Sequence, residues 1–262
     1  MENILQLDSF HLEDIVSKKH GSAFIKAKAY ELLIVRLFNK VGKKITPFNL
    51  NFVIKNREFW HFAEDKFTKI SKDELFEILD RPINDIMDNT YTIFEKVEKL
   101  ENRFYSKQNL IGFNQTWFLY KSLLVKIQRI ASKATTALSD FYNSSCKDDD
   151  AFAIKIADLI EHLQRVASNC SSLLENLDTL YSVYSTYSEE KLQSNIYLLT
   201  LISGIFLPLN LLVGFFGMNV SSLPFTNQGD GPGVYVVVFI MTIIVLILAL
   251  LIKKINKNSS WR

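Results

Sequence analysis

Two long stretches near the C-terminus contain no charged residue. Residues 196–217 and 234–252 are each close to the roughly 20 residues that an α-helix needs to cross the hydrocarbon core of a membrane. No Lys or Arg lies in residues 218–233 between them, whereas Lys191 precedes the first stretch and a basic tail, residues 253–262, follows the second. Because basic residues concentrate on the cytoplasmic side, the sequence predicts two transmembrane helices, an outer loop and cytoplasmic termini.

The first uncharged stretch differs from the second because it carries small and polar residues on one face. These residues follow one another at steps of three, seven, four and three: Thr200, Ser203, Asn210, Gly214 and Gly217. Such a face either permits close helix packing or lines a wet path, and the periodicity leaves both interpretations open. A single pair of helices cannot enclose an ion path, so conduction requires an oligomer with one such helix per subunit around a symmetry axis.

Upstream of the membrane segments, apolar residues recur at helical spacing over long stretches. One set alternates steps of four and three: Ile156, Ile160, Leu163, Ala167, Cys170, Leu174, Leu177, Tyr181 and Tyr184. A second set has the same spacing: Ile86, Thr90, Ile93, Val97, Leu100 and Phe104. Together with a helix over residues 118–142, these sets predict a cytoplasmic stalk of three long helices with coiled-coil-like seams, over residues 81–195. No Pro or Gly lies between residues 151 and 202, so the last helix is expected to continue unbroken into the first transmembrane helix.

Residues 1–80 are expected to form a small α/β domain. Three segments are rich in aromatic and aliphatic residues, as strands are: residues 30–38, 49–55 and 58–62. Gly42 and Pro47, and then the polar pair Asn56 and Arg57, are expected to separate them. The fold class is therefore mainly α: an integral membrane protein with a long helical stalk and a small N-terminal α/β domain.

Composition and motifs remove several classes of function. The 30 Lys and Arg residues nearly balance the 28 Asp and Glu residues, so the net charge of +2 gives no reason to expect a nucleic acid as the partner. Cys146 and Cys170 are too few and too far apart for a disulfide framework or a Cys-rich zinc site. The N-terminus lacks the pattern of a cleavable signal peptide. Without a phosphate-binding loop, an HExxH motif or a catalytic triad, the sequence does not predict an enzyme.

A short motif ends the first uncharged stretch. Gly217, Met218 and Asn219 stand eighteen residues after the pair Leu199-Thr200, with the segment 206–209 (FLPL) between them. This arrangement resembles the CorA superfamily of divalent metal ion transporters, in which a GMN motif follows the penultimate transmembrane helix. Further segments are similar to the family upstream: residues 11–15 (HLEDI), residues 77–80 (EILD), and Asp158 with Glu161 and His162. The outer loop is more similar to that of the ZntB-like, zinc-transporting branch.

The resemblance implies a homopentamer in the cell (inner) membrane, surrounded by lipid, that carries Mg²⁺, Co²⁺, Ni²⁺ or Zn²⁺ and uses no other cofactor. Its first transmembrane helices would surround a central pore, and the motif Gly217-Met218-Asn219 would form the outer mouth. The pore lining that the resemblance implies is Gln193, Ile196, Leu199, Ser203, Leu207, Asn210, Gly214, Gly217 and Asn219. Asn210 and Gln193 replace the Thr and Asn that are usual in the family. The N-terminal domain would be a reduced form of the family's αβα domain.

Three acidic residues acquire candidate roles from the same resemblance. Asp14 and Asp158 fall where magnesium-gated members bind regulatory metal ions between neighbouring cytoplasmic domains. Asp230, the one charged residue of the outer loop, would form a weak acidic ring that attracts cations. The alternative function is a non-conducting CorA-like membrane scaffold or regulatory protein. A receptor-like sensor is a weaker alternative, because an outer loop of about sixteen residues leaves little room for a ligand pocket.

Overall fold

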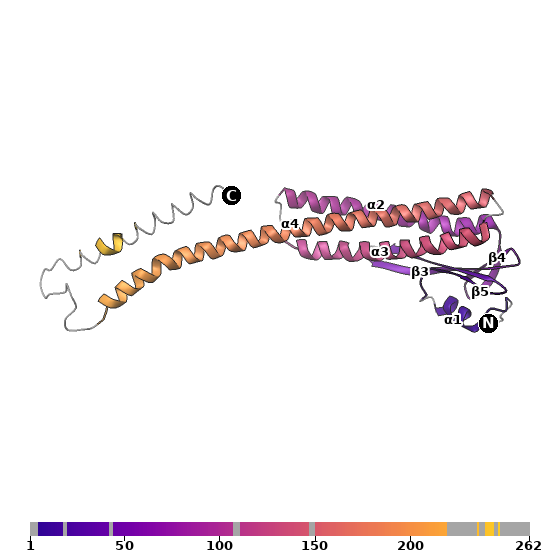
Figure 1. Cartoon of the computed structure of the whole chain (residues 1–262), viewed down its shortest axis with the longest axis horizontal. Helices are drawn as coiled ribbons and strands as arrows, with labels where there is room; N and C mark the ends of the chain where they lie inside the picture. The colour runs from indigo at the N-terminus through magenta and orange to yellow at the C-terminus, as the bar shows by residue number, and fades with distance from the viewer. Residues whose placement is uncertain are drawn as a thin grey trace. The chain divides into compact units, whose positions relative to one another are not determined.

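The computed structural model describes residues 5–17, 20–41, 44–106, 111–146 and 150–218, together with residues 235, 239–243 and 246. The described chain divides into two compact units, Met1–Ser182 and Val183–Arg262. The first unit begins with helix α1 (Ser9–Ser17) and a five-stranded sheet, and continues with three long helices (Figure 1). The strands are β1 (Ala23–Lys26), β2 (Glu31–Val41), β3 (Lys44–Lys55), β4 (Glu58–Ala63) and β5 (Lys66–Ile70). The long helices are α2 (Lys72–Tyr105), α3 (Phe113–Phe141), which a π-helical turn (Tyr142–Cys146) extends, and α4 (Asp150–Phe216).

The sheet is an antiparallel meander in which each strand pairs with the next along the chain. Leu32 and Ile34 of β2 pack in one cluster with Ile15 of α1. On the opposite face, the ring of Phe59 contacts Phe141 at the end of α3 and Phe152 of α4. Both faces of the sheet are therefore covered, which explains why β2 is a nearly continuous apolar run rather than an alternating one.

The sheet confirms the three predicted strands and corrects their number and one boundary. Strands β1 and β5 were not predicted, because the first has four residues and the second carries two lysines. Pro47 does not separate strands but lies inside β3, opposite Phe38. Since β4 pairs only with residues 51–55 of β3, Pro47 occupies an edge, where its missing N–H is tolerated. Asn56 and Arg57 form the expected turn, with φ values of 53° and 64°.

Helix α2 confirms one predicted seam and begins earlier than expected. All six residues of its predicted seam, from Ile86 to Phe104, are buried. The helix begins at Lys72 rather than near residues 77–81, because Ser71 and Glu74 form a capping box. The Ser71 hydroxyl accepts a hydrogen bond from the Glu74 N–H at 3.2 Å, and the Glu74 carboxylate accepts one from the Ser71 N–H at 2.7 Å. The Ser-x-x-Glu spacing was the sequence signal for this start.

Of the nine residues in the predicted seam of α4, four are buried and five, among them Tyr184, are not. Four predicted members are buried: Ile156, Leu163, Cys170 and Leu177. The alternate positions are filled by Leu159, Val166, Leu173 and Leu180 instead of the predicted Ile160, Ala167, Leu174 and Tyr181. The predicted and the observed alternate positions are both largely apolar, so the spacing of apolar residues alone is compatible with either set. The face that α2 and α3 cover decides between them.

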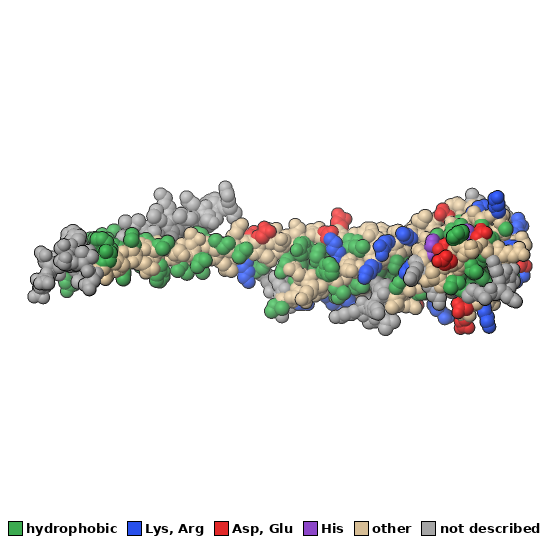
Figure 2. Space-filling model, turned by 90° about the horizontal axis from the view of Figure 1, so that it is seen from below, with side chains coloured by type: hydrophobic (Ala, Val, Ile, Leu, Met, Phe, Trp, Pro, Cys, Tyr) green, Lys and Arg blue, Asp and Glu red, His purple; other side chains and the backbone are tan. Residues whose placement is uncertain are grey.

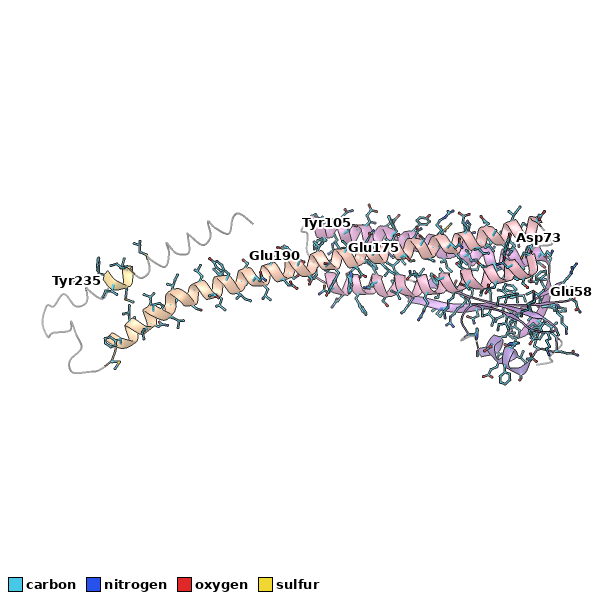
Figure 3. The ribbon with its side chains drawn as sticks, in the orientation of Figure 1. Glu58, Asp73, Tyr105, Glu175, Glu190 and Tyr235 are labelled. Atoms are coloured by element: carbon cyan, nitrogen blue, oxygen red, sulfur yellow. The ribbon has the colours of Figure 1, made fainter. Side chains whose placement is uncertain are left out.

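The long helices of the first unit are aligned by specific contacts. The indole N–H of Trp117 on α3 donates to the carbonyl of Leu177 on α4 at 2.9 Å, and the Trp117 ring stacks on Tyr181 with ring centroids 4.3 Å apart. Near the start of α2, Asp73 forms an ion pair with Lys155 of α4 at 2.7 Å. Asp73 and Tyr105, labelled in Figure 3, lie near the two ends of α2.

The second unit contains the rest of α4 and the few described residues beyond it. Helix α4 continues to Phe216, which confirms the prediction of an unbroken helix through residues 151–202. Of the second predicted transmembrane helix, residues 235, 239–243 and 246 are described and are helical. The remainder of that segment, the outer loop from Asn219 onward with Asp230, and the tail 253–262 lie outside the described residues.

Candidate functional site: one face of helix α4

The C-terminal part of α4 has the length and composition of a membrane span. Its last charged residues are Glu189, Glu190 and Lys191, and Glu190 is labelled in Figure 3. Beyond them, Figure 2 shows hydrophobic side chains along the helix without acidic or basic ones. Among the described residues, one helix, α4, contains a stretch apolar and long enough to cross a membrane, and no residue of that stretch is buried. At 1.5 Å per residue, residues 196–216 extend over about 30 Å, the thickness of the hydrocarbon core.

The proposed pore-lining residues within this span lie on one face, which we call the α4 stripe. With 3.6 residues per turn, they fall within a sector of about 80° on the helix. The members of the stripe are Ile196, Leu199, Ser203, Leu207, Asn210, Gly214 and Gly217. Gln193 lies on the same side, one turn before the span. All of these residues are exposed, including the large apolar side chains of Leu199 (64%) and Leu207 (68%).

The polar residues on or beside the stripe differ in how their hydrogen bonds are satisfied. The Thr200 hydroxyl donates to the carbonyl of Ile196 at 2.9 Å, so the helix itself satisfies it. Ser203 and Asn210 make no side-chain hydrogen bond to any described residue. An amide without partners in hydrocarbon costs several kcal/mol. In a membrane, the Asn210 amide would therefore require a polar partner, either water or another protein group.

Gly217 marks the end of the helix and leaves no room for a side chain. Its N–H donates to the carbonyl of Val213 at 2.8 Å. A Cβ atom added to Gly217 would lie 2.9 Å from that carbonyl oxygen, whereas one added to Gly204 or Gly214 would meet nothing within 4 Å outside the backbone of its own helix. Met218 follows with 54% of its surface exposed. Asn219, the last residue of the motif, lies outside the described residues.

Pro208 interrupts the hydrogen-bond ladder in the middle of the span. It lies inside α4 and has no N–H, so the carbonyl of Gly204, four residues earlier, loses its usual helical donor. Proline positions are also where membrane helices bend most easily. The segment 206–209 thus contains both an apolar member of the stripe, Leu207, and a position where the helix lacks a backbone hydrogen bond.

The two predicted regulatory carboxylates lie on different elements of the first unit. Asp14 is on α1, with its carboxylate 3.9 Å from Nε2 of His20. Asp158 is on α4, with its carboxylate 3.7 Å from Nε2 of His162. In the part of the chain that the structure describes, no three His, Cys, Asp or Glu side chains are grouped so as to hold a metal ion.

Comparisons with known proteins agree on one family. The family model for the CorA-like Mg²⁺ transporter protein matches residues 62–254. The structure is similar to the CorA magnesium transporter from Methanocaldococcus jannaschii, with a TM-score of 0.75, 16% identity, and coverage of 94% of this chain and 83% of that one. It is also similar to the full-length CmaX protein, with a TM-score of 0.70, 14% identity and coverage of 97% and 83%.

A third solved structure resembles a smaller part of the chain. The ZntB cytoplasmic domain from Vibrio parahaemolyticus has a TM-score of 0.52 and 11% identity, and the match covers 71% of this chain and 80% of that one. No curated protein matches the sequence. At these identities the solved structures establish a shared fold, and the family model covers well over half of the sequence. The chain therefore belongs to the family of CorA-like Mg²⁺ transporter proteins.

Proposed function

We propose that the chain is a subunit of a homo-oligomeric channel or transporter for divalent metal cations, with the α4 stripe lining its central pore. The observation that carries the proposal is the stripe itself. It places exposed small, polar and large apolar residues on one face of the uncharged part of α4, and Gly217 and Met218 follow the last helical residue. In a monomer this face would expose Asn210 to lipid, whereas around a symmetry axis it would face water and ions.

The second uncharged segment, residues 234–252, completes the membrane domain in this proposal. In this proposal it forms a second transmembrane helix on the lipid side of the first, and its described residues 239–243 are helical. The loop of residues 218–233 then lies outside the cell membrane, with Asp230 near the entrance, and both termini lie in the cytoplasm. The family's known assemblies suggest a pentamer.

The chemistry of the stripe suits hydrated ions. Rings of Ile196, Leu199 and Leu207 would form apolar constrictions, which can close a pore by excluding water. Ser203, Asn210 and Asn219 would offer neutral oxygen atoms, and such atoms can hold a hydrated ion through hydrogen bonds to its water shell. Mg²⁺ gives up its water reluctantly, and Co²⁺, Ni²⁺ and Zn²⁺ in hydrated form present similar surfaces. We therefore propose this group of divalent cations as the substrate.

Regulation by the transported ion is a separate part of the proposal. Asp14 and Asp158 each lie close to one histidine, and each carboxylate is at least one-third exposed. Both can therefore reach a ligand from a neighbouring subunit. Replacing both by Asn is expected to make transport insensitive to the internal Mg²⁺ concentration. Unchanged dependence of the transport rate on internal Mg²⁺ would remove these two residues from the proposal.

The test of the proposed function is ion uptake into liposomes that contain the purified protein. Uptake of Mg²⁺, Co²⁺ and Zn²⁺ is measured with and without a pH gradient, for wild type and for Asn219→Ala. We expect wild type to carry at least one of these ions, and Asn219→Ala to lower the rate by about tenfold, equivalent to about 1.4 kcal/mol. If wild type carries none of the ions under any gradient, the chain is a non-conducting scaffold.

A matched pair of glycine variants tests the helix end in the same liposomes. Gly217→Ala pushes a methyl group against the carbonyl of Val213 and is expected to lower uptake severalfold. Gly204→Ala adds the same group inside the helix, where nothing outside the helix's own backbone lies within 4 Å, and is expected to retain wild-type uptake. Equal rates for the two variants would show that the close approach at Gly217 does not shape the pore mouth.

A further inference from the structure

A cavity of about 470 Å³ in the first unit has four basic residues among the eight that line it. We call it the basic cavity. Its charged lining residues are Arg36 of β2 and Lys126, Arg129 and Lys133 of α3, and no carboxylate belongs to the lining. Pro47 and Ile130 supply apolar surface beside them. The cavity therefore has four positive charges around one space that is large enough for a small ligand.

The fold, rather than the sequence order, creates this cluster. Lys126, Arg129 and Lys133 follow one another at steps of three and four, so they share one face of α3. Helix α3 packs against β2 through other, buried residues, and the exposed side chains of Lys126, Arg129 and Lys133 line one cavity with Arg36. The Arg36 guanidinium donates from Nη1 to the carbonyl of His20 at 3.1 Å, and the backbone N–H of Arg36 donates to the Ser22 hydroxyl at 2.9 Å. Arg36 is thus held in position at the cavity.

Three cations of this cluster, all on α3, differ from two other cations of the helical bundle in their pairing. Lys121 pairs with Asp178 at 2.6 Å, and Arg165 pairs with Glu161 at 2.6 Å. By contrast, Lys126, Arg129 and Lys133 form no ion pair with any residue that the structure describes. Like charges held around one space repel one another. A bound anion would offset this repulsion, because its negative charge would attract each of the surrounding cations.

We propose that the basic cavity binds a small soluble anion that carries two or more phosphate groups, such as a nucleoside di- or triphosphate. Arginine offers paired N–H donors that match phosphate oxygens, and lysine adds mobile point charges, so the lining combines the two usual phosphate-binding side chains. Pro47 and Ile130 form an apolar surface that can contact an uncharged part of the ligand. This surface is too small to bind the acyl chains of a lipid. The chemistry is therefore that of a soluble phosphate compound rather than a lipid headgroup.

The proposal is tested by calorimetric titration of the full-length protein in an uncharged detergent, with pyrophosphate and with ATP. We compare wild type with Lys126→Gln/Lys133→Gln and with the control Lys96→Gln/Lys99→Gln, which removes two exposed lysines from α2, outside the cavity. The cavity variant should bind both probes about tenfold more weakly, and the control should stay within about twofold of wild type. Higher salt should weaken wild-type binding.

Three results would overturn the proposal. The first is no binding of either probe to wild type at millimolar concentration. The second is equal loss of affinity in the cavity variant and the control. The third is much tighter binding of a short-chain phosphoinositide than of ATP, which would identify a lipid headgroup as the ligand. Circular dichroism checks the fold of each variant, and the single variant Lys126→Gln, expected to show a partial loss, replaces the double variant if the latter does not fold.

Discussion

The two parts of helix α4, residues 152–180 and 183–215, differ in how many side chains they bury and in where charged residues lie. Between Phe152 and Leu180, the helix buries nine apolar side chains at alternating steps of four and three, and charged residues such as Asp158 and Arg165 lie between them. Between Val183 and Phe215 it buries none, although it is more apolar and has no charge after Lys191. The absence of charge is the clearest difference between the two parts, and it is what the proposed transmembrane position of the second part requires.

The largest difference between the two parts is expected from shortening one leucine in each. Leu163→Ala removes a side chain that is fully buried in the helical bundle, and should lower the free energy of unfolding by about 2–5 kcal/mol. Leu198→Ala acts on a side chain that is 57% exposed, and should cost less than about 1 kcal/mol, because lipid is as apolar as leucine. Thermal unfolding in detergent, followed by near-ultraviolet circular dichroism, compares them. Equal losses would mean that the exposed part of α4 is packed as tightly as the bundle.

A second pair of variants tests whether the exposed surface of each part of α4 faces lipid or water. Ile205→Lys places a charge in the middle of the uncharged segment, away from the α4 stripe, and should raise the free energy of membrane insertion by about 3 kcal/mol. Ile154→Lys changes a side chain that is 70% exposed in the first unit, and should alter the free energy of unfolding by no more than about 0.5 kcal/mol. A glycosylation assay of insertion in microsomes measures the first effect. Efficient insertion of Ile205→Lys would contradict a transmembrane assignment.

The smallest effect concerns the reactivity of a cysteine in the buried part. Burial raises the pKa of the Cys170 thiol from 9.0 to about 12. At pH 8 its thiolate fraction is then about a thousandth of that of an ordinary thiol. In Cys146→Ser protein, Cys170 should react with a thiol reagent only as the bundle opens. A cysteine at exposed Ser188, introduced by Ser188→Cys with both native cysteines replaced by Ser, should react within minutes. Similar rates for the two would show that α4 is accessible at Cys170.

Because the pKa of the Cys170 thiol is higher in the folded state, the free energy of unfolding is expected to decrease at high pH. The folded state favours the neutral thiol, so Cys170 does not reduce stability below pH 9, where the unfolded thiol is also neutral. As the pH rises above 9, the unfolded state gains by ionising, and stability should fall. Cys170→Ala should flatten this part of the pH profile. An unchanged slope between pH 9 and pH 11 would exclude Cys170 as its source.

Local patterns in the sequence were sufficient for much of the fold and for the position of the candidate site. The uncharged run over residues 196–217, its stripe and the motif at Gly217 need only neighbours along one helix, whose geometry is fixed by the backbone. The seam of α2 was predictable for the same reason. Missed features had weak local signals: β1 is too short, β5 is too polar, and the capping box at Ser71 was overlooked.

The sequence by itself determined which segments are helical, which one is apolar enough for a membrane, and which of its faces carries Asn210 and the glycines. Only the tertiary structure decided that Leu159 and Val166, rather than Ile160 and Ala167, are buried, and that Arg36 meets Lys126, Arg129 and Lys133. The physical reason is that helix periodicity acts over a few residues, whereas burial and charge clustering depend on contacts between segments far apart in the chain.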